Sequence, residues 1–148
     1  MKRYPPLLLG LILIGAVVLS GCSAAASPSQ SPPDSAAVAQ AGDALSLPVE
    51  IDAAQLDQLR SREDVFVLDV REDYEFQNGH VPGAAWIPLG ELADRMSEVP
   101  KDKTVVAVCR SGNRSGQATQ LLRQAGIDAH NMVGGMNAWS AAGFAVEP

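Results

Sequence analysis

Two short, almost entirely apolar segments constrain the fold of this chain more than any other feature of its sequence. VFVLDV at residues 65–70 and TVVAVC at residues 104–109 are rich in branched side chains, and each is followed by a helix-like pattern. Strands that are continuous apolar runs are typical of parallel sheets with helices on both faces. The pattern therefore predicts an α/β unit built on a mainly parallel sheet.

The segments around these two runs continue the alternation of strands and helices. Asp52 is placed to cap a helix in which Ala53, Leu56 and Leu59 share one face. We expect further strands at residues 84–88 and 129–133, and further helices at residues 72–79, 89–99, 115–126 and 134–143.

The beginning of the chain has the three parts of a bacterial secretion signal. Two basic residues are followed by an apolar run at residues 7–19 and then by small residues. The run is shorter than the roughly 20 residues that a membrane-spanning helix needs. Its end, Leu-Ser-Gly-Cys, resembles the lipobox of bacterial lipoproteins, in which the cysteine is acylated and begins the mature chain. We therefore interpret residues 1–21 as a lipoprotein signal peptide and Cys22 as the lipidation site. An uncleaved anchor and an ordinary secretion signal are the alternatives.

The remaining chain divides into a tether and one domain. Residues 22–48 consist largely of Ala, Ser, Pro, Gln and Gly, which bury too little apolar surface to offset the entropy of ordering, so we expect a flexible tether. Residues 49–148 are predicted to fold as a single domain. The protein is then expected outside the cytoplasm, anchored by lipid to the cell membrane, or to the outer membrane in a bacterium with two membranes.

The charge of the chain limits its partners. The formal net charge is −6 and becomes −8 once the two basic residues of the signal peptide are removed. An acidic domain gains nothing near phosphate backbones or anionic lipids, so we expect no nucleic-acid partner. Membrane contact is expected only through the lipid anchor, and we expect a monomer.

Cysteine usage indicates a chemical role for one residue. The chain has two cysteines, Cys22 and Cys109. If lipid occupies Cys22, then Cys109 has no disulfide partner in a compartment where thiols usually oxidise. A chemical task explains such a thiol.

The loop after Cys109 has the composition of an anion-binding site. CRSGNRS, residues 109–115, places two arginines and a glycine between a strand end and a helix start. Gly112 allows backbone N–H groups to converge on one point, to which the helix adds its positive end. Arg110 and Arg114 are candidate donors to an anionic substrate or to the loop carbonyls. The pattern predicts a depressed pKa for Cys109 and hence a nucleophilic thiolate. The alternative is a buried strand cysteine followed by an ordinary turn.

Three motifs in order resemble the rhodanese-like sulfurtransferase family. VLDVREDYEFQNGHVPGAAWIPLGEL is similar to the first-half signature of that family, CRSGNRS to its active-site loop and NMVGGMNAWSAAGFAV to its closing segment. The resemblance implies a single rhodanese-like α/β domain in which Cys109 carries sulfur as a persulfide. The implied donor is a small sulfur-containing anion such as thiosulfate, or a protein persulfide, and the acceptor is a thiophile or a thiol. Neither a metal nor an organic cofactor is implied.

The resemblance also implies roles for individual residues of the site. The substrate and the persulfide are expected to bind in the active-site loop, which contains Arg110, Ser111, Gly112, Asn113, Arg114 and Ser115. Transfer from a preformed thiolate needs no general base. We therefore interpret four residues before the loop as structural supports: Asp69, Arg71, Glu75 and His80.

Two other functional classes stay open at this point. A phosphatase or an arsenate reductase uses a related cysteine loop, and a noncatalytic persulfide carrier or redox sensor would need the same thiol. Four residues separate Cys109 from Arg114, one fewer than in cysteine phosphatases, which favours a single bound sulfur over a whole phosphate.

Overall fold

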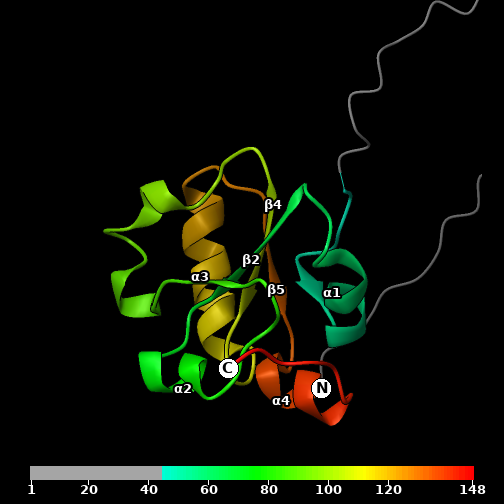
Figure 1. Ribbon diagram of the computed structural model, residues 1–148. Helices are drawn as coiled ribbons and strands as arrows, with labels where there is room; N and C mark the ends of the chain where they lie inside the picture. Colours follow the sequence, from blue (N-terminus) through cyan, green and yellow to red (C-terminus); the bar gives the residue numbers. More distant parts are fainter. Residues whose placement is uncertain (1–44) are drawn as a thin grey trace, which may run out of the picture. The chain divides into compact units, whose positions relative to one another are not determined.

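The structure is a computed structural model that describes residues 45–148 (Figure 1). The predicted signal peptide, the lipidation site Cys22 and most of the predicted tether lie outside the described residues. Five strands form one sheet in the order β1-β5-β4-β2-β3, in which every neighbouring pair is parallel. The strands are β1 (Glu50–Ile51), β2 (Val65–Asp69), β3 (Ala85–Trp86), β4 (Thr104–Val108) and β5 (Ala129–Met132). The predicted parallel α/β fold is therefore confirmed.

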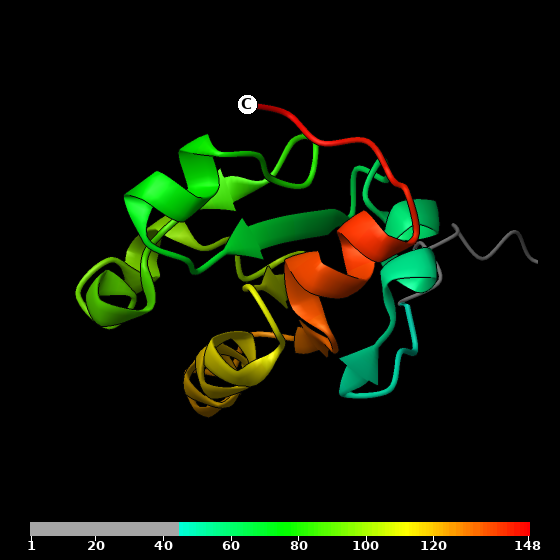
Figure 2. The same ribbon diagram turned by 90° about the horizontal axis from the view of Figure 1, so that it is seen from below.

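Helices cover both faces of the sheet, as Figure 2 shows. α1 and α4 lie on one face and α3 lies on the other, while α2 follows β2 directly. The helices are α1 (Ala53–Leu59), α2 (Asp73–Gln77), α3 (Asn113–Gln124) and α4 (Gly135–Ala141).

Alternate residues of the central strand β4 pack against different helices. Val106 and Val108 belong to the core under α1 and α4. Val105, Ala107 and the residue after the strand, Cys109, belong to the core under α3. This alternation directs the cysteine side chain toward the N-terminus of α3, because successive side chains of a strand point to opposite faces.

The continuous helix expected at residues 89–99 does not form, so that prediction was wrong. Two short 3-10 helices, Leu89–Glu91 and Met96–Glu98, take its place. Gly90 lies in the first of them and is a weak helix former. Between the two, Leu92 is fully buried in the α3-side core, which holds this connection against the sheet.

Two further boundaries differ from the sequence prediction. α3 begins at Asn113, two residues before Ser115, because Gly112 adopts a φ of +98° and turns the chain directly into the helix. β1 was not expected, because a strand of two residues is too short to show an alternation of apolar and polar side chains.

The packed domain also begins before the expected boundary at Val49. Leu45 and Leu47 pack against the core under α1 and α4. The carbonyl of Pro48 accepts a hydrogen bond from Nδ1 of the buried His130 at 2.7 Å. Within residues 45–148, no helix has the length and apolar character to cross a membrane.

Candidate active site

The Cys109 sulfur lies at the carboxyl end of β4, inside the turn that leads into α3. The residue is only 1% exposed. Its Sγ accepts a hydrogen bond from the Gly112 N–H at 3.1 Å and another from the Ser115 hydroxyl at 3.3 Å. The loop thus directs donors at the sulfur, as an anion requires.

The balance of burial and hydrogen bonding favours the thiolate. Burial is the largest single influence on the pKa of Cys109, and it acts to raise that pKa. Hydrogen bonds from the Ser115 hydroxyl and from the backbone N–H groups of Ser111, Gly112 and Ser115 act in the opposite direction. Together they outweigh burial, so the pKa of Cys109 lies below its ordinary value. Such a thiol is a better nucleophile near neutral pH.

The backbone of α4 holds two loop carbonyls away from the sulfur. The Met136 N–H donates to the Cys109 carbonyl at 2.8 Å, and the Asn137 N–H donates to the Arg110 carbonyl at 3.0 Å. Gly135, the first residue of α4, permits this approach, because a Cβ there would overlap the Cys109 carbonyl oxygen. The start of α4 is therefore part of the site.

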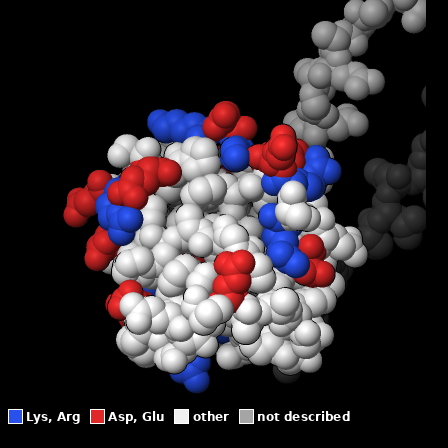
Figure 3. Space-filling model, viewed as in Figure 1, with Lys and Arg blue, Asp and Glu red and all other residues white. Residues whose placement is uncertain are grey.

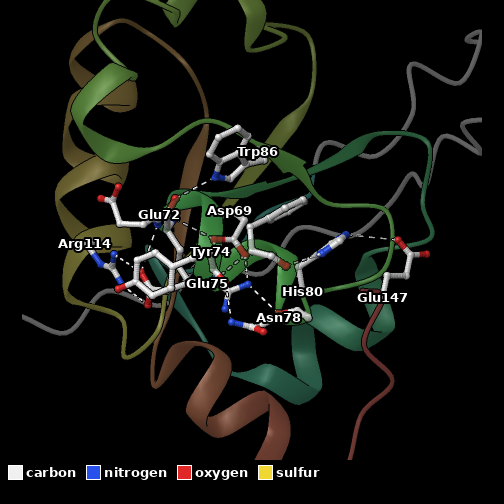
Figure 4. Close-up of polar contacts among 12 residues, drawn as sticks. Asp69, Glu72, Tyr74, Glu75, Asn78, His80, Trp86, Arg114 and Glu147 are labelled. Atoms are coloured by element: carbon white, nitrogen blue, oxygen red, sulfur yellow. Dashed lines mark hydrogen bonds and ion pairs between the residues drawn. The ribbon is translucent and has the colours of Figure 1, made fainter.

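Arg114 binds Glu75 on α2, as Figure 4 shows. Its two terminal nitrogens donate to the two carboxylate oxygens at 2.7 and 2.8 Å. These hydrogen bonds lower the pKa of Glu75, although burial opposes the shift. Within the described chain Arg114 hydrogen-bonds to Glu75 and to no loop carbonyl, and donation from its remaining N–H groups to a substrate stays a prediction. The pair ties the first turn of α3 to α2.

Asp69, which is labelled in Figure 4, forms a buried ion pair with Arg71 where β2 ends. Arg71 Nε lies 3.0 and 2.9 Å from the two Asp69 oxygens, and one terminal nitrogen donates to the Gly79 carbonyl at 2.9 Å. The Trp86 indole N–H donates to the Arg71 carbonyl at 2.9 Å. These contacts join the end of β2 to β3 and to the segment after α2.

His80 contacts the C-terminal segment and α2. Its ring stacks on Phe76 with 3.7 Å between centroids, and its Nδ1 donates to the Phe76 carbonyl at 3.1 Å. Nε2 lies 3.6 Å from the Glu147 carboxylate (Figure 4). All of these contacts lie outside the Cys109 loop, so the structure gives His80 no direct part in the chemistry there.

Arg110 has an exposed side chain and forms no ion pair with any residue of the described part of the chain. It lines a depression of about 400 Å³ beside the loop, together with Tyr74, Asn78, Asn137 and Ser140. Arg71 and Glu75 also line it, each paired with an oppositely charged residue, so Arg110 is the charged group there without an ion-pair partner in the described chain.

The other predicted loop residues act mainly through their backbone. Ser111 and Asn113 have exposed side chains, and Gly112 is buried. Among residues 45–148, no group of three or more His, Cys, Asp or Glu side chains is arranged to hold a metal ion.

Two residues of the site were not predicted from the sequence. Asn131 on β5 is buried, and its Oδ1 lies 2.6 Å from the Ser115 hydroxyl oxygen. The available signal was the pair of polar residues, His130 and Asn131, inside a short strand. Gly135 could have been found from the paired glycines immediately before the last helix.

Comparison with known proteins gives this geometry a family context. Residues 52–142 match the family described as the rhodanese-like domain. A protein named Sulfurtransferase from Allochromatium vinosum is 42% identical over 99 residues, which are 66% of this chain and 92% of that protein. The protein named Thiosulfate sulfurtransferase GlpE, from Pseudoalteromonas translucida, is 37% identical over 93 residues, which are 62% of this chain and 89% of that protein. The crystal structure of a rhodanese-related protein from Thermoplasma volcanium matches with a TM-score of 0.63 and 33% identity, covering 66% of this chain and 96% of that one.

Replacement of Gly135 by alanine should disable the donor arrangement around Cys109. The added Cβ overlaps the Cys109 carbonyl, so the loop must shift, and its N–H groups no longer point at the sulfur. We expect the pKa of Cys109 to rise toward its ordinary value of about 8.5. The measurement is the pH dependence of iodoacetamide alkylation, followed by mass spectrometry on the peptide that contains Cys109.

Gly126→Ala is the matched control for this substitution. Gly126 also has a positive φ, +79°, but a Cβ there meets nothing within 4 Å. It therefore carries the backbone strain of about 1–2 kcal/mol without the overlap. An unchanged alkylation profile in Gly135→Ala, or an equal change in both variants, would contradict the role given to α4.

Replacement of Glu75 by glutamine should destabilise the domain at neutral pH by about 1 kcal/mol, because charge-assisted hydrogen bonds to the partly exposed Arg114 are weakened. The pKa of Glu75 is lowered in the folded protein, so its contribution is present above the ordinary carboxyl pKa of about 4.3 and is lost as the pH falls through the lowered value. The difference in unfolding free energy between wild type and variant should therefore disappear in acid. Urea unfolding of both proteins at a series of pH values from 7 into the acid range measures it.

Glu98→Gln provides the comparison, since Glu98 pairs with Arg95 on the exposed surface. We expect no resolvable destabilisation from that change. A Glu75→Gln penalty that stayed constant down to the pH at which the domain unfolds in acid would show that the carboxylate charge contributes nothing.

Proposed function

This chain belongs to the rhodanese-like domain family, and on that premise we propose that it transfers sulfane sulfur through a persulfide on Cys109. One observation carries the proposal. A buried cysteine sulfur at the carboxyl end of β4 is surrounded by hydrogen-bond donors from its own loop, and these donors favour the thiolate. This is the form that attacks sulfur.

The proposed reaction has two displacement steps. In the first, the Cys109 thiolate attacks the outer sulfur of thiosulfate; a new S–S bond forms, the S–S bond of the donor breaks, and sulfite leaves with its electron pair. In the second, a thiophile such as cyanide or a thiolate attacks the outer sulfur of the persulfide. The persulfide bond then breaks, and its electron pair returns to Cys109 as the thiolate.

The protein contributes electrostatic preorganisation to both steps. The N–H groups of Ser111, Gly112 and Ser115 are fixed around the sulfur before any donor arrives, so they stabilise the negative charge without reorganising. The exposed guanidinium of Arg110 is the candidate contact for an anionic donor.

The surface charge supports small sulfur compounds or thiols as partners. On the face shown in Figure 3, acidic and basic side chains are interspersed and form no broad patch of one sign. Several are paired, as Arg62 is with Asp64 and Arg95 with Glu91. A nucleic acid would require a continuous basic surface, which this face does not present.

Incubation of the full chain with thiosulfate should add one sulfur atom at Cys109, because the thiolate is available to attack. Intact-mass and peptide mass spectrometry should show the added mass, and dithiothreitol should remove it. Steady turnover of thiosulfate with cyanide would distinguish a catalyst from a noncatalytic carrier, which would accept the sulfur but release it slowly.

Cys109→Ser is the matched variant, since it keeps nearly the same volume and removes the thiol. It should retain the thermal unfolding temperature while losing both the adduct and the turnover. Full sulfur transfer by Cys109→Ser would rule out the proposed mechanism.

The same preparation should transfer sulfur and leave aryl phosphates essentially intact. Four residues separate Cys109 from Arg114, and the Arg114 terminal nitrogens are bound to Glu75. A cysteine phosphatase uses a loop that is one residue longer, and its arginine forks onto two of the phosphate oxygens. Parallel assays with thiosulfate and with p-nitrophenyl phosphate test this. Phosphate release that requires Cys109 and exceeds sulfur transfer would reverse the assignment.

A further inference from the structure

The Ser115 hydroxyl stands between the reactive sulfur and a buried amide. Its oxygen lies 3.3 Å from Cys109 Sγ and 2.6 Å from Asn131 Oδ1. Ser115 is completely buried and Asn131 is 6% exposed. A hydroxyl has a single proton, so Ser115 donates fully to only one of these two acceptors at a time.

The orientation of the Asn131 amide decides which acceptor receives that proton. In the structure the amide oxygen faces Ser115, so Asn131 Oδ1 and Cys109 Sγ compete for the one hydroxyl proton. When the hydroxyl donates to Asn131, its oxygen is free to accept the S–H of a neutral thiol. If the amide rotates by half a turn, its NH₂ group donates to the Ser115 oxygen. The Ser115 proton then points to Cys109 Sγ, where it stabilises a thiolate.

The surroundings of Asn131 allow both orientations. Its side chain lines a depression of about 320 Å³, together with Gly116, Gln117 and Gln120 of α3 and Glu50 of β1. Whichever amide group points away from Ser115 therefore faces space that water can fill. Neither orientation buries an unsatisfied polar group.

We propose that Asn131 is a positioning residue whose amide orientation determines, through Ser115, whether Cys109 is held as a thiol or as a thiolate. When the thiol ionises, its proton leaves to water, the amide rotates, and the Ser115 O–H turns from Asn131 to the sulfur. This inference rests on the proposed function, because control of the thiolate matters only if the thiolate is the nucleophile. Its test needs no sulfur transfer, so the two can fail independently.

The charged groups around these three residues do not bond to Ser115 or to Asn131 within the described chain. Glu75 neutralises Arg114, and Asp69 neutralises Arg71. Arg110, Arg71 and Glu75 line the depression beside the loop, and Glu50 lines the depression beside Asn131. Arg114 carries the remaining charge near the sulfur, and Glu75 and Glu72 act on it.

Asn131→Asp tests the relay. A carboxylate accepts from Ser115 and cannot donate, so it keeps the Ser115 proton away from the sulfur. We expect the midpoint of the alkylation profile of Cys109 to rise by about one pH unit, which is about a tenfold loss of thiolate at a fixed lower pH. The full chain is used, and alkylation by iodoacetamide is followed on the peptide that contains Cys109.

Two comparisons separate the relay from the added charge. Gln120→Glu places a negative charge in the same depression without contact to Ser115, and it should leave the midpoint near that of wild type. In a Ser115→Ala background, Asn131→Asp should have little further effect, because the hydroxyl that transmits the change is gone. An equal rise with and without Ser115 would indicate repulsion through space and would overturn the relay, as would the absence of any rise.

A measurement on the wild-type protein keeps the proposal testable if Asn131→Asp fails to fold. The side-chain amide resonances of Asn131 should shift with pH at the same midpoint as Cys109 alkylation. Cys109→Ser should abolish that shift. Amide resonances that stay constant while Cys109 ionises would overturn the proposal.

Discussion

The contact between the start of α4 and two carbonyls of the Cys109 loop is the constraint on which the site depends. A trans peptide unit is planar, so its C=O and its N–H point in opposite directions. When α4 draws the carbonyls of Cys109 and Arg110 outward, the following N–H groups, those of Arg110 and Ser111, turn inward. Of the donors around the sulfur, the Ser111 N–H is thus oriented by a hydrogen bond to a different helix, and a side chain at Gly135 would disrupt that contact.

The arginines near the site serve mostly to brace it. Arg71 is held by Asp69 and also reaches the Gly79 carbonyl, and Arg114 is held by Glu75. A buried ion pair adds little net stability, but removal of one partner leaves an uncompensated charge, so such pairs fix geometry more than they strengthen a fold. The stabilisation of the sulfur anion then comes chiefly from backbone dipoles and a hydroxyl. Of the two loop arginines, Arg110 is the one without an ion-pair partner in the described part of the chain.

The features that could be predicted from the sequence are those formed by residues close together in the chain. The apolar run that ends at Cys109 and the glycine at residue 112 are neighbours in the chain, and they identify a strand, a turn and a helix start without knowledge of other elements. The contacts that complete the site join distant segments: Arg114 with Glu75, and Ser115 with Asn131. No periodicity encodes such pairs.

The same reason explains the errors at the level of elements. Whether residues 89–99 form one helix or two short turns depends on how the connection lies over the sheet, which its own helical pattern does not report. The signal peptide and the lipidation of Cys22 stay predictions, because those residues lie outside the described part of the chain.

The division of donors around the sulfur suits a charge that moves during the proposed cycle. In the thiolate the charge sits on Sγ, where the Ser115 hydroxyl and the Gly112 N–H reach it. In the persulfide the charge shifts outward by one S–S bond, about 2 Å. Sγ then needs less stabilisation, and the Ser115 proton is free to return to Asn131. Because the loop N–H groups are spread around the turn, some of them can stabilise the outer sulfur of the proposed persulfide while the Ser115 hydroxyl donates to Asn131. A single fixed cation over Sγ would favour one of these two states over the other. A ring of backbone donors does not single out one of the two states in this way, which suits both steps of the proposed sulfur transfer.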